Sequence, residues 1–176
     1  MNFLYHGIPE MMHGDALVPL STMHAKDPEL HAKYLEKYKG REAIVERRVP
    51  LLDCSWSDVV QLLPLHPGQL FELQHKLGLK DEIPDYRYFK IDASRLDPNK
   101  TAVFFKTAPG DEHVTVKWLR DVDFDELQSI PPATIRYYES MIGTNEPVFN
   151  YQFVPHILYQ GEIDIAGCDV ISLTNK

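Results

Sequence analysis

The longest apolar passage of the chain lies in residues 47–67, RRVPLLDCSWSDVVQLLPLHP. Within it, residues 59–63 form a short and mostly apolar run bounded by turn residues, which favours a buried strand over a surface helix. Two arginines open the passage, and a turn containing Pro64, His66 and Pro67 ends it. We therefore expect this strand to lie in the middle of a sheet, with its ends opening on a surface.

Alternating or short apolar runs predict most of the other strands. The expected strands cover residues 3–5, 86–91, 102–106, 113–118, 146–153 and 162–171, with another short one between residues 11 and 20. The pair 102–106 and 113–118 is a hairpin candidate, because a Pro-Gly turn separates its two strands. Residues 154–158 are expected to turn the chain out of the strand 146–153.

The clearest helix signal starts at Asp27-Pro28, where an aspartate at the N-cap precedes a proline at the first helical position. Leu30, Tyr34 and Tyr38 recur every fourth residue, and Gly40 is a natural C-terminal stop. Further helices are expected over residues 67–77, 123–129 and 133–142, and residues 40–48 are either a short helix or a loop. Together the elements predict a single α+β domain over residues 1–176, with mixed or antiparallel sheets and flanking helices.

Composition narrows the class of protein. With 176 residues, 44% hydrophobic and 25% charged, the chain is long enough for one well-packed core. It has neither an apolar run long enough to span a membrane nor a signal peptide, so we expect a cytoplasmic protein. The net charge of −8 argues against a broad electrostatic grip on nucleic acid. Cys54 and Cys168 are far apart, which indicates reduced thiols and no zinc site.

Motifs of known catalytic spacing are absent, and the eight histidines show no metal-ligand spacing, His24 and His31 included. Three features remain as candidates for chemistry. His6 ends the first strand beside Gly7, where a ligand has room to approach the backbone, although a histidine that only caps a turn is about as common. The pair Arg47-Arg48 precedes the buried strand and is either an anion contact or a surface charge pair. Glu146 leads a later strand and is either functional or an edge charge.

The order of these features resembles the ADP-ribosyltransferase fold, and within it the DarT-like DNA ADP-ribosyltransferase toxins. The resemblance is carried by LYHGIP at residues 4–9, by RRVP and SDVVQLLPLHP within residues 47–67, by FKIDASRL at residues 89–96, and by NEPVFNYQFVP and IDIAGCDVI within residues 145–171. These pieces span most of the chain in the family's order, and each of them is short.

The resemblance implies NAD as a substrate and a role for each candidate residue. His6 would hydrogen-bond the nicotinamide ribose, with Gly7 beside it, and Arg48 or Arg47 would contact the dinucleotide or orient the reacting centre. Glu146 would stabilise the positive charge that develops on the ribose when the glycosidic bond breaks, and would help to deprotonate the acceptor.

The chain departs from the family where aromatic residues are expected, because Gln61, Leu62 and Leu63 stand there. The resemblance leaves the acceptor open between DNA, RNA, protein and a small molecule, and NAD hydrolysis is an alternative within the same fold. The alternative from another class is a non-catalytic interaction domain, either an antitoxin or a partner-binding module. Convergence of His6, Arg48 and Glu146 on one cleft would favour the enzyme, whereas Glu146 and His6 on opposite faces would rule it out.

Overall fold

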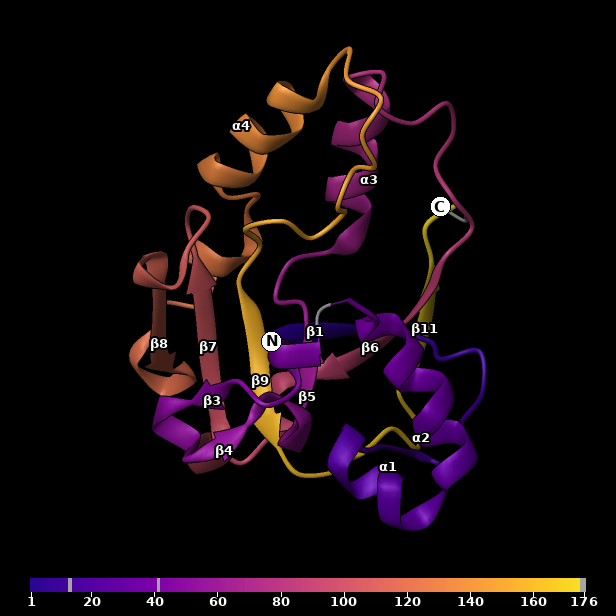
Figure 1. Ribbon diagram of the computed structural model, residues 1–176, viewed down its shortest axis with the longest axis vertical. Helices are drawn as coiled ribbons and strands as arrows, with labels where there is room; N and C mark the ends of the chain where they lie inside the picture. The colour runs from indigo at the N-terminus through magenta and orange to yellow at the C-terminus, as the bar shows by residue number, and fades with distance from the viewer. Residues whose placement is uncertain (13, 41, 175–176) are drawn as a thin grey trace.

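A computed structural model describes residues 1–12, 14–40 and 42–174. The fold is a mixed α+β arrangement built on antiparallel sheets (Figure 1). One sheet has four strands in the order β5-β9-β7-β8, and another has three in the order β1-β6-β11. The strands of these two sheets are β5 (Val59–Leu62), β9 (His156–Gln160), β7 (Thr101–Lys106), β8 (Val114–Trp118), β1 (Phe3–Gly7), β6 (Arg87–Asp92) and β11 (Asp169–Ser172).

Two pairs of two-residue strands complete the sheet structure. β10 (Ile163–Asp164) pairs with β2 (Ala16–Leu17), and β3 (Arg48–Val49) pairs with β4 (Cys54–Ser55). The first pair joins the N-terminal segment to the C-terminal segment by backbone hydrogen bonds. The second forms a small arch beside β7 and β8.

The α-helices gather at two ends of the molecule (Figure 1). α3 (Pro67–Lys76) and α4 (Pro132–Met141) lie at one end, and α1 (Leu20–Lys26) and α2 (Pro28–Leu35) lie at the other. Short 3-10 helices connect the elements: η1 (Glu36–Tyr38), η2 (Glu42–Ile44), η3 (Pro50–Leu52), η4 (Trp56–Asp58), η5 (Ala93–Arg95), η6 (Pro98–Lys100), η7 (Asp111–His113), η8 (Leu119–Asp121) and η9 (Asp125–Gln128).

The two larger sheets meet at one bridge between Tyr5 of β1 and Leu63, the residue after β5. The Tyr5 N–H donates to the Leu63 carbonyl at 2.9 Å, and the Leu63 N–H donates to the Tyr5 carbonyl at 2.8 Å. β5 is therefore an edge strand of the four-stranded sheet, and the prediction of a strand in mid-sheet is wrong. On the side of β5 that faces away from β9, the chain bonds to β1 at Leu63 but does not pair with β1 along Val59–Leu62.

Three clusters of buried side chains form the core. The strands alternate between clusters, because successive side chains of a strand point to opposite faces. On β1, Leu4 belongs to the first cluster and Tyr5 to the third. The first contains Leu4, Val60, Leu62, Ile91 and Ile157; the second contains Val49, Trp56, Ala102 and Phe104; the third contains Tyr5, Leu63, Leu70, Tyr88 and Tyr138.

Local signals in the sequence placed several elements correctly. The Asp27 side chain accepts from the Leu30 N–H at 2.9 Å at the start of α2, and Gly40 has a left-handed φ of 79° beyond η1. The predicted helix at residues 67–77 is α3, and the predicted hairpin is β7 paired with β8. These segments were predicted correctly because their caps and turns depend on residues that are close together in the sequence.

Three further predictions about the chain are wrong. Residues 146–153 form an irregular segment that ends in turns at residues 150–153 instead of a strand, and the neighbouring strand β9 starts at His156, where a turn was expected. The predicted strand 162–171 is divided into β10 and β11, with a left-handed Gly167 between them. α1 had no counterpart in the sequence analysis.

Candidate functional site

A large cavity opens where β1 and β5 separate. Continuing the antiparallel bridge between Tyr5 and Leu63 would place His6 opposite Leu62 and Gly7 opposite Gln61, but the strands do not pair there. These four residues instead line a cavity of about 1070 Å³. That volume is just above the range of roughly 300–1,000 Å³ typical of small-molecule sites.

The parting strands turn backbone polar groups toward this gap. In an antiparallel ladder, the N–H and C=O of alternate residues point to the same edge of a strand. Tyr5 bonds to Leu63 on the β5 side, and the Ile8 N–H donates to the Arg87 carbonyl on the other side at 2.9 Å. The alternation therefore turns the amide groups of Gly7 toward β5, and those of Gln61 toward β1.

Tyrosine side chains form an aromatic part of the cavity wall. Tyr5, Tyr86, Tyr88 and Tyr151 all line it, and the hydroxyl oxygens of Tyr88 and Tyr151 are 2.6 Å apart. Burial raises the pKa of Tyr88 and of Tyr151, so both phenols are neutral. A second hollow of about 400 Å³ shares Gly7, Tyr86, Tyr88 and Tyr151 with the first, which extends the space along these rings.

Among the described residues, two histidines line the cavity, one from each sheet. His6 lies on β1, and His156 is the first residue of β9. His156 Nδ1 is 2.8 Å from the Val154 carbonyl oxygen, and burial lowers the pKa of the imidazole. A neutral ring bonded to a carbonyl carries its proton on Nδ1 and a free lone pair on Nε2.

The described residues from Ile8 through α2 line one side of the cavity; one ion pair joins this segment to the residue before β10, and a second lies within the segment. Lys26 of α1 contacts Glu162 at 2.5 Å, and Lys33 of α2 contacts Glu10 at 3.3 Å. The Tyr34 hydroxyl also donates to the Met11 carbonyl at 3.1 Å. The charged groups in the cavity wall are mainly acidic: Glu10, Asp15, Asp27, Glu36 and Glu162, with Lys26 and Lys33.

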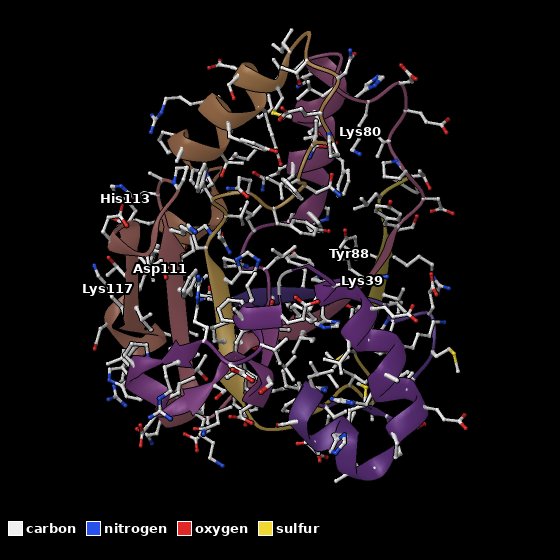
Figure 2. The ribbon with its side chains drawn as sticks, viewed as in Figure 1. Lys39, Lys80, Tyr88, Asp111, His113 and Lys117 are labelled. Atoms are coloured by element: carbon white, nitrogen blue, oxygen red, sulfur yellow. The ribbon has the colours of Figure 1, made fainter. Side chains whose placement is uncertain are left out.

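The two candidate arginines lie away from this cavity. Arg47 contacts Asp111 at 2.8 Å, and Arg48 of β3 contacts Asp53. Figure 2 shows Asp111 beside the β7–β8 hairpin, on the opposite side of the molecule from Tyr88 of the cavity wall. Both arginines therefore have acidic partners near the arch of β3 and β4, and neither is among the described residues that line the cavity.

Glu146 is exposed in the segment between α4 and β9. This segment runs beside α3 and α4, at the end of the molecule shown at the top of Figure 1. Glu146 does not line the cavity either, within the part of the chain that the structure describes. The structure thus brings His6 and Gly7 to the cavity, and leaves Arg47, Arg48 and Glu146 outside it.

Sequence reasoning missed His156, Tyr88 and Tyr151 as site residues. The cavity unites them through pairings distant in the chain: β9 with β5, β6 with β1, and the Tyr88–Tyr151 hydroxyl contact. The available signal was local: two histidines, each beginning or ending a short apolar run, and tyrosines clustered at residues 86–88 and at residue 151.

The described residues contain no group of three or more metal-ligating side chains suited to a metal ion. His24 of α1 and His31 of α2, whose spacing in the sequence is not that of metal ligands on one helix, lie with their Nδ1 atoms 3.3 Å apart. Among the described helices, none has the length and apolar character needed to cross a membrane.

Comparison with known proteins returned nothing: no family model, no curated protein and no solved structure matches this chain.

Proposed function

We propose that this chain is an ADP-ribosyltransferase-like protein that binds NAD in the cavity between β1 and β5. The observation that carries the proposal is the opening of the two sheets just after the Tyr5–Leu63 bridge, with His6 and Gly7 at the parting strand. These are the residues for which the sequence resemblance implies contact with the nicotinamide ribose.

The chemistry of the wall suits the nicotinamide end of NAD. Its pyridinium ring is a flat cation, and tyrosine rings attract cations over their faces. Tyr5, Tyr86, Tyr88 and Tyr151 supply such rings where the family's usual aromatic positions are Gln61, Leu62 and Leu63. The carboxamide needs a donor and an acceptor together, and the strand-edge amide groups at Gly7 and Gln61 offer both.

Charge in the cavity wall bears on the pyrophosphate and on the acceptor. Lys26 and Lys33 are cationic groups in the wall, and a pyrophosphate would compete with Glu162 and Glu10 for them. Among the described residues of the wall, five carboxylates against two lysines make a poor surface for a polyanion. Of the DNA, RNA and protein acceptors considered, a protein therefore fits best.

The transfer step requires a carboxylate near the developing positive charge. Glu146, expected in that role, lies outside the cavity in this structure. That placement supports the second candidate function, a non-catalytic module that binds NAD or a protein partner without transferring ADP-ribose. The two candidates differ in whether bound NAD loses nicotinamide.

Calorimetric titration with NAD⁺ tests binding, and chromatographic detection of released nicotinamide tests chemistry. His6→Ala should weaken NAD⁺ binding by about tenfold, the equivalent of one hydrogen bond at the upper end of its usual range. Arg48→Ala is the matched control, because Arg48 lies outside the cavity, and it should bind like the wild type.

Each outcome has a distinct meaning. Binding with nicotinamide release, increased by an added protein, DNA or RNA, supports the transferase and identifies the acceptor class. If Glu146→Gln abolishes release while preserving binding, Glu146 reaches the reacting centre during turnover. Binding without release supports the non-catalytic module. An absence of NAD⁺ binding at millimolar concentration would reject both NAD-dependent forms of the proposal.

A further inference from the structure

The turn that leads into β9 is held in an unusual backbone conformation. Phe153 has a φ of 61°, a left-handed value that is rare for a bulky side chain and costs conformational energy. The surrounding contacts hold this turn: the Val154 N–H donates to the Tyr151 carbonyl at 3.2 Å, and the Thr134 hydroxyl donates to the Gln152 carbonyl at 2.9 Å. Such conformations cluster where a fold places functional groups.

This turn carries two cavity groups, Tyr151 and His156. Tyr151 reaches Tyr88 of the three-stranded sheet through its hydroxyl, and His156 begins the central strand β9. The strained turn therefore links the two sheets across the cavity and orients both side chains.

The hydrogen bonds of His156 leave one ring nitrogen for a ligand. Nδ1 is occupied by the Val154 carbonyl at 2.8 Å. Among the described residues, Nε2 has no hydrogen-bond partner, and it is not one of the side-chain atoms sealed from solvent without a partner. Because Nδ1 holds the proton, Nε2 is the hydrogen-bond acceptor of this cavity-lining residue.

We propose that His156 Nε2 accepts a hydrogen bond from a hydroxyl group of the ligand bound in this cavity. The nearby phenols of Tyr88 and Tyr151 engage each other, and the carboxylates Glu10 and Glu162 engage lysines. The unpartnered nitrogen is therefore well suited to select a ligand that presents a donor. A ribose is a ligand of this kind, because its hydroxyl groups are hydrogen-bond donors.

The inference deepens the proposed function, and it rests on that function only for NAD as the source of the ribose. Its first test needs no ligand: histidine side-chain ¹⁵N spectra of the wild-type protein identify which ring nitrogen is protonated. The His156 signal is assigned by its loss in His156→Gln. We expect a neutral ring with the proton on Nδ1, and a proton on Nε2 instead would overturn the proposal.

The second test adds ligands to the same sample: NAD⁺, adenosine and ribose 5-phosphate, in separate titrations. We expect the Nε2 resonance of His156 to move upfield with at least one of them, as it does when that nitrogen accepts a hydrogen bond. No change with any of the three overturns the inference. A change with adenosine or ribose 5-phosphate in a protein that does not bind NAD⁺ supports the inference and rejects the proposed function.

Two variants separate the acceptor from the rest of the ring. His156→Gln places an amide oxygen at about the position of Nε2, whereas His156→Asn keeps only a shorter group that can still donate to the Val154 carbonyl. We expect His156→Asn to bind the responding ligand about tenfold more weakly, and His156→Gln to restore most of that loss. Equal binding by His156→Asn and wild type, in a protein that does bind the ligand, would show that His156 is only structural. The wild-type spectra decide the matter if either variant fails to fold.

Discussion

At the scale of single residues, His156 links the site to stability, because burial lowers the pKa of its imidazole. An unfolded chain has an ordinary histidine, with a pKa near 6.5, and it binds a proton at a pH where the folded protein does not. Stability should therefore fall as the pH falls below about 6.5, and continue falling until the folded-state pKa is reached. The loss is at most about 1.4 kcal/mol per pH unit for this one group.

Urea unfolding of wild type and His156→Gln at about pH 7 and about pH 5 measures this effect. The variant should lose less stability between the two conditions, because glutamine does not titrate. Asp85 and Asp92, whose pKa values are lowered by hydrogen bonds, weaken the fold only at more acidic pH. His66→Asn is a comparison variant: burial also lowers the pKa of His66, but its side chain is more exposed than that of His156. Asparagine can still accept from the Gly68 N–H, as His66 Nδ1 does, so this variant should have a smaller effect on the pH dependence. Equal pH dependence in wild type and His156→Gln would contradict this account.

Single residues also show what the sequence could and could not predict of the site. His6 and Gly7 were found because a strand end beside a glycine is a local feature, and both line the cavity. Arg47 and Arg48 were selected by their position before an apolar run. In the structure Arg47 pairs with Asp111 and Arg48 pairs with Asp53, both outside the cavity. Asp111 is far from Arg47 in the chain, so no local pattern could have revealed that ion pair.

At the scale of elements, a buried polar chain ties α3, α4 and the segment before β9 together. The Gln74 amide of α3 donates to the Tyr138 hydroxyl of α4 at 2.9 Å, and that hydroxyl donates to the Asn150 carbonyl. Gln74 and Tyr138 are both fully buried. Water cannot reach these buried groups to replace a lost hydrogen bond, so removing one partner leaves the remaining polar groups buried and unsatisfied, which costs free energy.

Tyr138→Phe should therefore destabilise the protein by about 1–3 kcal/mol, since it leaves the Gln74 amide and the Asn150 carbonyl without their partner. Chemical denaturation followed by circular dichroism gives the free energy of unfolding. The control is Tyr137→Phe, which removes a hydroxyl that accepts from the Phe149 N–H at 3.0 Å in an exposed setting. Tyr137→Phe should cost less than about 1 kcal/mol. Similar losses in the two variants would mean that burial does not control this contact.

The same region explains the largest error in the predicted elements. Residues 146–153 alternate in polarity, yet Val148 and Tyr151 pack beside the third core cluster from an irregular segment. β9 lies between β5 and β7, with Ile157 and Leu158 both fully buried. A strand covered on both faces has no alternation to recognise, and only its pairing partners identify it.

At the scale of the whole molecule, the sequence predicted an α+β fold with mixed or antiparallel sheets, and the structure has the antiparallel form of this class. The division into two sheets was not predicted, since it depends on where β1 leaves β5. Two residues that are 58 positions apart, Tyr5 and Leu63, make the bridge beyond which the strands part. Local patterns do not encode such a contact, and the cavity exists because of it.

A fold joined in this way raises the question of whether the two sheets unfold together. Trp56 packs against Phe104 with ring centroids 5.1 Å apart, and Trp118 lies on β8, so tryptophan fluorescence reports on the four-stranded sheet. Far-ultraviolet circular dichroism reports on both sheets and all helices. The first core cluster contains Leu4 and Ile91 from one sheet with Leu62 and Ile157 from the other. Because this shared core belongs to both sheets, we expect one cooperative transition, with coincident urea midpoints for the two signals. A fluorescence midpoint clearly displaced from the dichroism midpoint would instead identify two units that unfold independently, with the cavity at their boundary.

Adding a ligand that bridges the strands at Gly7 and Gln61 should raise the common midpoint, because it binds only the folded state.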